Sequence, residues 1–126
     1  WKENGIQKFY APKKKGWVSH AITKTQNTDE YFEAECKTIK TIMNELGHQK
    51  LDLLKLDVEG AEYEIINSII NDGLDIKTIC VEFDELNFNE WSSFIKIRNS
   101  IKSLIKRGYA LAYVSGGDYT FVKQYD

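Results

Sequence analysis

Acidic side chains gather where two apolar segments of the sequence end. Asp57 and Glu59 lie at the end of the segment at residues 51–58, and Glu82 lies near the end of the segment at residues 76–83. If the two segments are neighbouring parallel strands about 4.8 Å apart, these carboxylates share one rim of a sheet, and open α/β sheets bind ligands at that rim. Because like charges repel, we expect a metal ion, a cationic ligand or a hydrogen-bonding ligand between them.

Each of these acidic residues also has a structural explanation. Acidic side chains in the first turn of a helix are favoured by the helix dipole, and we favour this explanation for Glu62. Glu82 could equally pair with a lysine at a strand end. Asp57 follows a strand tip with no visible capping partner, so we favour a functional role for it. Asp84 and Glu85 add further carboxylates after the second segment.

The elements that position these residues follow from the apolar pattern. Residues 51–58 have the length and composition of a strand buried on both faces. Residues 61–72 carry isoleucines at helical spacing, and Gly73 follows where a left-handed residue ends a helix. Residues 76–83 read as a second buried strand. Strand, helix and strand in this order predict a βαβ crossover with parallel strands.

The rest of the chain continues the alternation of strands and helices. Apolar residues along 91–105 predict a long helix, and the tail predicts a hairpin that turns at residues 115–118. In the first fifty residues we expect short strands at 8–12, 17–22 and 31–39, and a helix at 40–46. These elements predict an α/β fold, with residues 1–126 forming a single domain.

Composition excludes several classes of function. The chain has 126 residues, 42% of them hydrophobic, and none of its apolar runs is long enough to span a membrane. A net charge of -2 gives no general attraction for nucleic acid, and we interpret the run Lys13, Lys14 and Lys15 as a solvated loop. Two cysteines are too few for a disulfide scaffold, which favours a reducing compartment and a cytoplasmic location.

The stretch LLKLDVEGAEYEII at residues 53–66 resembles the most recognisable motif of the FkbM-type S-adenosylmethionine-dependent methyltransferases. The residues that match the motif are Lys55, Asp57, Glu59, Gly60, Ala61 and Glu62. Four other stretches are similar to the family as well: CKTIKTIMNELGHQKLD before the motif, then ICVEFDE, IKRGYALAYV and DYTFVK. The resemblance therefore extends over essentially the whole chain.

The resemblance implies a Rossmann-like class I methyltransferase fold. Such domains begin with a strand, a glycine-rich turn and a helix that cradle the cofactor. The glycines of this sequence form no such turn. We therefore expect the chain to correspond to the C-terminal portion of the catalytic domain, in which parallel strands with crossover helices end in an antiparallel hairpin. The N-terminal cofactor-binding strands are missing, and S-adenosylmethionine binding is expected to require them.

Roles for individual residues follow from the resemblance and from side-chain chemistry. Asp57 is implied to lie near the transferred methyl group, as both a catalytic and a cofactor-binding residue. Glu59 is a further catalytic candidate, and Glu82 and Ser19 are candidates for binding the acceptor. His20 is a candidate general base, although a structural histidine is the more frequent case. The acceptor is expected to be a hydroxyl of a small molecule or a glycan.

Two other functions remain open at this stage. Carboxylates at strand tips also bind Mg²⁺, so a magnesium-dependent phosphotransfer or nuclease-like domain is one alternative. The family gives no reason to require a metal. The other alternative is a methyltransferase-like remnant or interaction module without catalytic activity.

Overall fold

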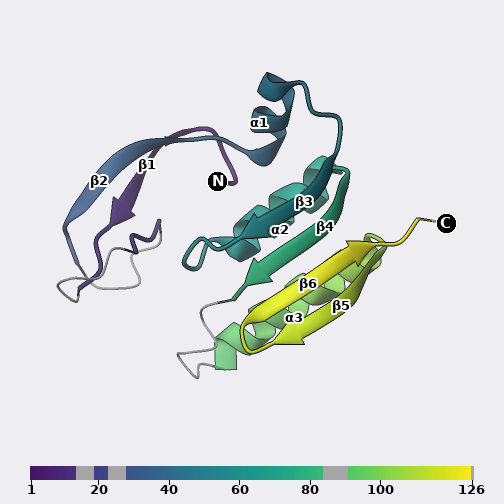
Figure 1. The fold of residues 1–126 in the computed structure, drawn as a ribbon. Helices are drawn as coiled ribbons and strands as arrows, with labels where there is room; N and C mark the ends of the chain where they lie inside the picture. The colour runs from purple at the N-terminus through teal and green to yellow at the C-terminus, as the bar shows by residue number, and fades with distance from the viewer. Residues whose placement is uncertain (14–18, 23–27, 84–90, 126) are drawn as a thin grey trace.

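The chain forms a two-stranded ribbon followed by a four-stranded mixed sheet with helices against it (Figure 1). The structure is a computed structural model and describes residues 1–13, 19–22, 28–83 and 91–125. Its elements, in chain order, are β1 (Gly5–Tyr10), β2 (Tyr31–Cys36), α1 (Ile39–Leu46), β3 (Leu51–Leu56), α2 (Glu62–Asp72), β4 (Ile76–Glu82), α3 (Trp91–Lys106), β5 (Tyr109–Ser115) and β6 (Asp118–Lys123). The alternation of strands and helices predicted from residue 51 onward is confirmed.

The larger sheet has the strand order β3-β4-β6-β5. Strands β3 and β4 are parallel and are joined by α2, which confirms the predicted βαβ unit. Strand β6 runs antiparallel to both β4 and β5, so the closing hairpin is also confirmed and the sheet is mixed. The hairpin turn lies against the end of β4: Phe83 N donates to Gly117 O at 2.9 Å. A Cβ atom at position 117 would stand 3.0 Å from the carbonyl oxygen of Phe83, so glycine permits this approach.

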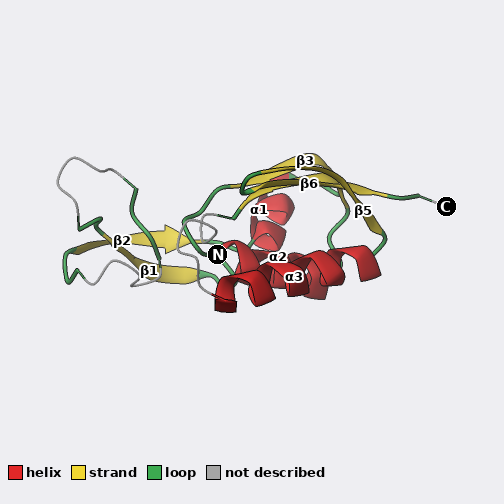
Figure 2. Ribbon diagram, turned by 90° about the horizontal axis from the view of Figure 1, so that it is seen from below, coloured by secondary structure: helices red, strands yellow, loops and turns green. Residues whose placement is uncertain are grey.

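The hydrophobic core lies between this sheet and two helices. Figure 2 shows α2 and α3 side by side on the same face of the sheet. The side chains with no exposed surface come from each of these layers: Ile66, Ile76, Ile79, Leu104 and Phe121. Burying a side chain of this size contributes about 1.5 to 3 kcal/mol, so this layer supplies much of the stability of the fold.

Within the described residues, the other face of the sheet is open (Figure 2). The sequence predicts that the first strand of the pair is buried on both faces, and this prediction is wrong. Strand β3 is an edge strand, and the side chain of Leu53 is 60% exposed. In the described part of the chain, α2 and α3 lie on the opposite face (Figure 2). Because side chains alternate along a strand, Lys55 and Asp57 share the open face with Leu53.

The helix ends match the sequence signals to within a residue. Gly47 and Gly73 end α1 and α2 with φ values of 71° and 64°, the left-handed conformation that glycine adopts without strain. Helix α1 begins after Thr38, whose side-chain oxygen accepts a hydrogen bond from Thr41 N. The boundaries predicted for both helices are therefore nearly correct.

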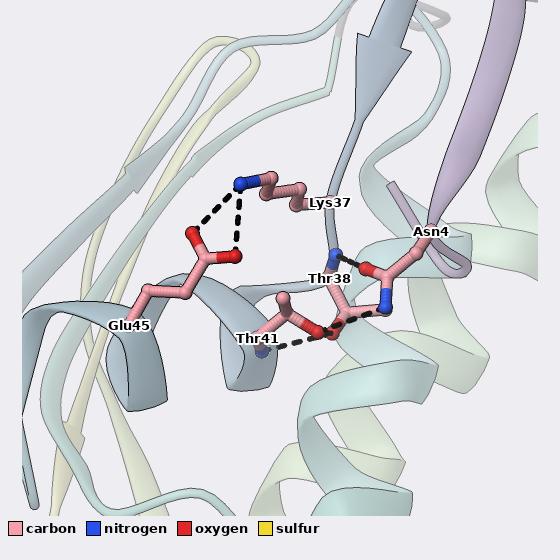
Figure 3. A network of polar contacts seen from close by, with 5 residues as sticks. All are labelled: Asn4, Lys37, Thr38, Thr41 and Glu45. Carbon is pink, nitrogen blue, oxygen red and sulfur yellow. Dashed lines mark hydrogen bonds and ion pairs between the residues drawn. The ribbon is translucent and has the colours of Figure 1, made fainter.

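The ribbon of β1 and β2 is attached to α1 by a polar network (Figure 3). Asn4 Oδ1 accepts from Thr38 N at 2.9 Å, and Asn4 Nδ2 donates to Thr41 Oγ1 at 3.0 Å. Lys37 Nζ donates to both carboxylate oxygens of Glu45 at 2.8 Å. These contacts connect the residues that flank β1 and β2 to both ends of that helix.

One predicted strand is not found in the described residues. Of the segment at 17–22, residues 17 and 18 lie outside the description, and Ala21 forms only an isolated antiparallel bridge with Tyr10. Residues 19–22 therefore form no strand, and the prediction is wrong for this part of the segment.

The hydrogen bond of Tyr109 allows a test of what stabilises the end of the sheet at which β4 and β5 begin. Its hydroxyl donates to the carbonyl oxygen of Ile76 at 2.6 Å, and burial raises the pKa of Tyr109 to about 12. In the unfolded chain the hydroxyl of Tyr109 ionises near pH 10. Because the folded protein favours the neutral hydroxyl, the free energy of unfolding should fall as the pH rises from about 10 to 12. Tyr109→Phe should lower the free energy of unfolding by about 1 kcal/mol at pH 8 and reduce the alkaline fall.

Urea unfolding at pH 8 and pH 11 measures both effects. Tyr113→Phe, at an exposed position of the same strand, is the matched control and should keep the wild-type stability and alkaline fall. An alkaline fall of the same size in Tyr109→Phe and in the wild type would contradict the role given to this hydroxyl.

Candidate active site

Two of the predicted site residues meet at the rim of the sheet, on either side of a lysine. Lys55 Nζ lies 2.8 Å from Asp57 Oδ2 and 3.6 Å from Glu82 Oε2. The parallel register brings these side chains together, because Lys55 lies opposite Cys80. Asp57 comes two residues after Lys55, and Glu82 comes two residues after Cys80. The side chains of Asp57 and Glu82 are 46% and 39% exposed. The rim is therefore open to ligands.

Lys55 supplies the positive charge that the acidic rim requires. Its hydrogen bond to Asp57 raises the pKa of Lys55, and the charges of Asp57 and Glu82 act in the same direction. The ammonium group is therefore fully charged at neutral pH. Because the three side chains are exposed, solvent screens their attraction, and a ligand can displace the lysine at little cost in free energy.

A third carboxylate at this rim was missed by the sequence reasoning. Asp118 lies opposite Glu82 across the antiparallel pair β4 and β6, and its side chain is exposed. Ser115 lies opposite Asp118 on β5. Asp118 follows the turn Gly116 and Gly117, which predicts the hairpin but not the strand that lies beside it. Only the long-range pairing of β6 with β4 brings this residue to the rim.

The turn between β3 and α2 has an unusual backbone. Glu59 has a φ of 51° and Gly60 has a φ of 95°, and Ala61 N donates to Val58 O at 3.3 Å. Positive φ at both central residues is typical of a type I′ turn. A residue with a side chain costs about 1 to 2 kcal/mol in this conformation, so Glu59 is held there by its surroundings.

The carboxylate of Glu62 lies beneath this turn. Its side chain is 1% exposed. Glu62 Oε1 accepts from Val58 N at 3.0 Å, and Oε2 accepts from Gly60 N at 3.0 Å. The prediction that Glu62 has a structural role is confirmed, but its contacts are with the turn and not only with the helix dipole. A buried carboxylate with these contacts is not available to a ligand.

The other predicted residues, Ser19 and His20, lie in the segment that precedes β2. Ser19 and His20 are exposed residues beside the ribbon. The ring of His20 meets Phe32 of β2 edge-on, with a centroid distance of 5.1 Å. The contacts described for this segment link it to β1 and β2, so His20 and Ser19 stay candidates without a described link to Asp57. Asp84 and Glu85 lie outside the described residues.

Comparison with known proteins identifies the family. Residues 2–111 match the model of the methyltransferase FkbM domain, and the chain belongs to this family of methyltransferase domains. The proteins named "Probable methyltransferase-like protein 24" from Rattus norvegicus and Homo sapiens are each 28% identical to the chain over 78 residues. These matches cover 60% of the chain and 20% of each relative. No solved structure matches the chain.

Three further findings concern metal ligands, cysteines and membrane-spanning helices. Within the described ranges, no three His, Cys, Asp or Glu side chains converge as metal ligands. Both cysteines, Cys36 and Cys80, are free thiols. Among the described helices, none combines the length and the apolar character that crossing a membrane requires.

Replacing the lysine at the rim should change how the stability responds to salt. In the wild type, salt screens attraction between Lys55 and two carboxylates. In Lys55→Met, it would screen repulsion between Asp57 and Glu82. We expect added NaCl to lower the wild-type urea midpoint relative to that of Lys55→Met. Lys40→Met is the control, since Lys40 pairs with a single carboxylate in the described part of the chain, that of Asp72. The same salt response in all three proteins would contradict the proposed balance of charge.

Proposed function

We propose that this domain takes part in S-adenosylmethionine-dependent methyl transfer to an oxygen atom, the hydroxyl of a small molecule or a glycan. Membership of the methyltransferase FkbM domain family supports the reaction class. The observation that carries the assignment of residues is the position of Asp57, half-exposed at the carboxyl end of a parallel strand beside Glu82 and Lys55. Ligands of open α/β sheets bind at such ends.

The cofactor, when bound, supplies an electrophilic methyl group on a positively charged sulfonium. The residues at the rim fit such a group, because exposed carboxylates offset its charge. In this proposal Asp57 accepts the proton of the acceptor hydroxyl or orients that hydroxyl for attack. Glu82 accepts a hydrogen bond from the acceptor. Glu59 lies in the adjoining turn and is a second candidate for this task.

The segment between β1 and β2 supplies the remaining candidates. His20 is exposed in this segment and can serve as a general base if the acceptor extends that far, with Ser19 as a hydrogen-bonding neighbour. The sequence contains no glycine-rich turn of the kind that cradles the adenosine part of the cofactor. We infer that an N-terminal portion outside this chain holds that part, and that the rim described above faces the reacting atoms.

Substitution of Asp57 tests the proposal. In the full-length protein, Asp57→Asn should lower kcat by about a hundredfold or more, because it removes the proton acceptor. The unfolding temperature should change little, since the Asp57 side chain is half-exposed and pairs with Lys55, which is also exposed. Asp52→Asn, which changes another exposed carboxylate of β3, is the matched control and should retain activity. Activity and stability that fall together would make Asp57 structural.

Calorimetric titration with S-adenosylhomocysteine separates the rival functions. The methyltransferase proposal expects binding heat in the full-length protein, both for the wild type and for Asp57→Asn. A non-catalytic remnant gives no heat under the same conditions. Turnover of phosphate esters that requires Mg²⁺, together with no response to S-adenosylhomocysteine, would favour the phosphotransfer alternative and overturn the proposal.

A further inference from the structure

We propose that Glu62 is a positioning residue that sets the direction of Asp57 and Glu59 through the backbone of the turn between β3 and α2. This inference rests on the proposed function. Glu62 is 1% exposed, so substrate and cofactor do not touch it. It acts on the site through two backbone N–H groups, those of Val58 and Gly60.

The two N–H groups belong to peptide planes that flank the functional residues. The N–H of Val58 lies in the peptide that follows Asp57, so its direction fixes the backbone torsion at which Asp57 leaves the strand. The N–H of Gly60 lies in the peptide that follows Glu59. Because one carboxylate holds both groups, the orientations of the two peptides are linked. The turn therefore presents both acidic side chains from one fixed backbone.

The strained conformation of Glu59 indicates what the contact does. A φ of 51° at a residue with a side chain persists only where the surroundings determine it. Gly60 N donates to Glu62 Oε2 at 3.0 Å, and this hydrogen bond fixes the peptide that follows Glu59. The N-terminus of α2 also favours a negative charge at this point.

The direction of these hydrogen bonds distinguishes positioning from helix capping. A capping side chain accepts from amides in the first turn of its helix, and α2 has no such side-chain cap at Ala61. Glu62 instead accepts from amides that precede the helix. The segment it restrains is therefore the loop that carries Asp57 and Glu59.

Amide hydrogen exchange tests the hold on the turn without any assay of activity. The probes are the amides of Val58 and Gly60 in wild type, Glu62→Gln and Glu62→Ala. Glu62→Ala should speed their exchange by at least about tenfold, because the opening free energy of the turn falls. Glu62→Gln keeps the shape and one acceptor oxygen, so it should fold and show an intermediate effect.

Glu64→Gln is the matched control, because Glu64 is an exposed carboxylate on the same helix that pairs with Lys2. Its exchange at Val58 and Gly60 should equal that of the wild type. If both Glu62 variants keep wild-type protection at these amides, the proposal is overturned.

A double-mutant cycle tests whether the turn acts on catalysis through Asp57. In the full-length protein, below the unfolding temperature, Glu62→Gln should lower kcat by about tenfold with little change in KM, since the substrate does not touch it. In an Asp57→Asn background, the same change should lower kcat much less, because the two residues act in series. Equal effects in both backgrounds would overturn positioning through Asp57.

The hydrogen-exchange experiment and the double-mutant cycle together distinguish failure of this inference from failure of the proposed function. A wild-type protein without methyl transfer or S-adenosylhomocysteine binding refutes the proposed function. The exchange measurement then decides alone whether Glu62 holds the turn. Normal methyl transfer with an additive double-mutant cycle leaves the proposed function intact and refutes the positioning role.

Discussion

The parallel pairing of β3 and β4 is the constraint from which the rest of the structure follows. Parallel strands cannot be joined by a tight turn, so the chain must cross over through α2. That crossover buries the apolar side of α2 on one face of the sheet and returns the chain to start β4 beside β3. It also places the ends of both strands at one rim. Core and candidate site are thus two results of a single pairing.

The rim and the turn beside it use carboxylates in two opposite ways. Glu62 is withdrawn from solvent and engaged by backbone N–H groups, which makes it a rigid part of the framework. Asp57 and Glu82 remain half-exposed and share a lysine that is itself exposed. A framework group must resist exchange with solvent, whereas a group that meets a ligand must give up its partner easily. This division fits a site in which Glu62 fixes the backbone while Asp57 and Glu82 can exchange Lys55 for a ligand.

The sequence predicts the local elements well and their neighbours less well. The isoleucine spacing of α2 and the glycines at 47 and 73 determine helices from within their own segments, so both were predicted closely. Strand β3 was expected to be covered on both faces, but Leu53 is exposed. The prediction failed because an apolar composition does not tell whether another layer covers a face of the strand.

The candidate site shows the same limit. Asp57 and Glu82 were predicted to meet because parallel strand ends are aligned by rule, and they do lie beside one another. Lys55 was noted in the motif without a role, and Asp118 was missed, because its place depends on the insertion of β6 between β4 and β5. The contacts of Glu62 with the turn were not predicted, because the helix dipole already explained an acidic residue at the start of a helix.

The contact between Gly117 and Phe83 makes the C-terminal hairpin a wall of the candidate site. With no side chain at position 117, the tip of the hairpin lies directly on the end of β4, one residue after Glu82. The strand end and the hairpin tip therefore form one corner of the rim, joined by a backbone hydrogen bond. An insertion at this corner would separate the hairpin tip from the end of β4, and under the proposed function it would change which acceptors fit the rim.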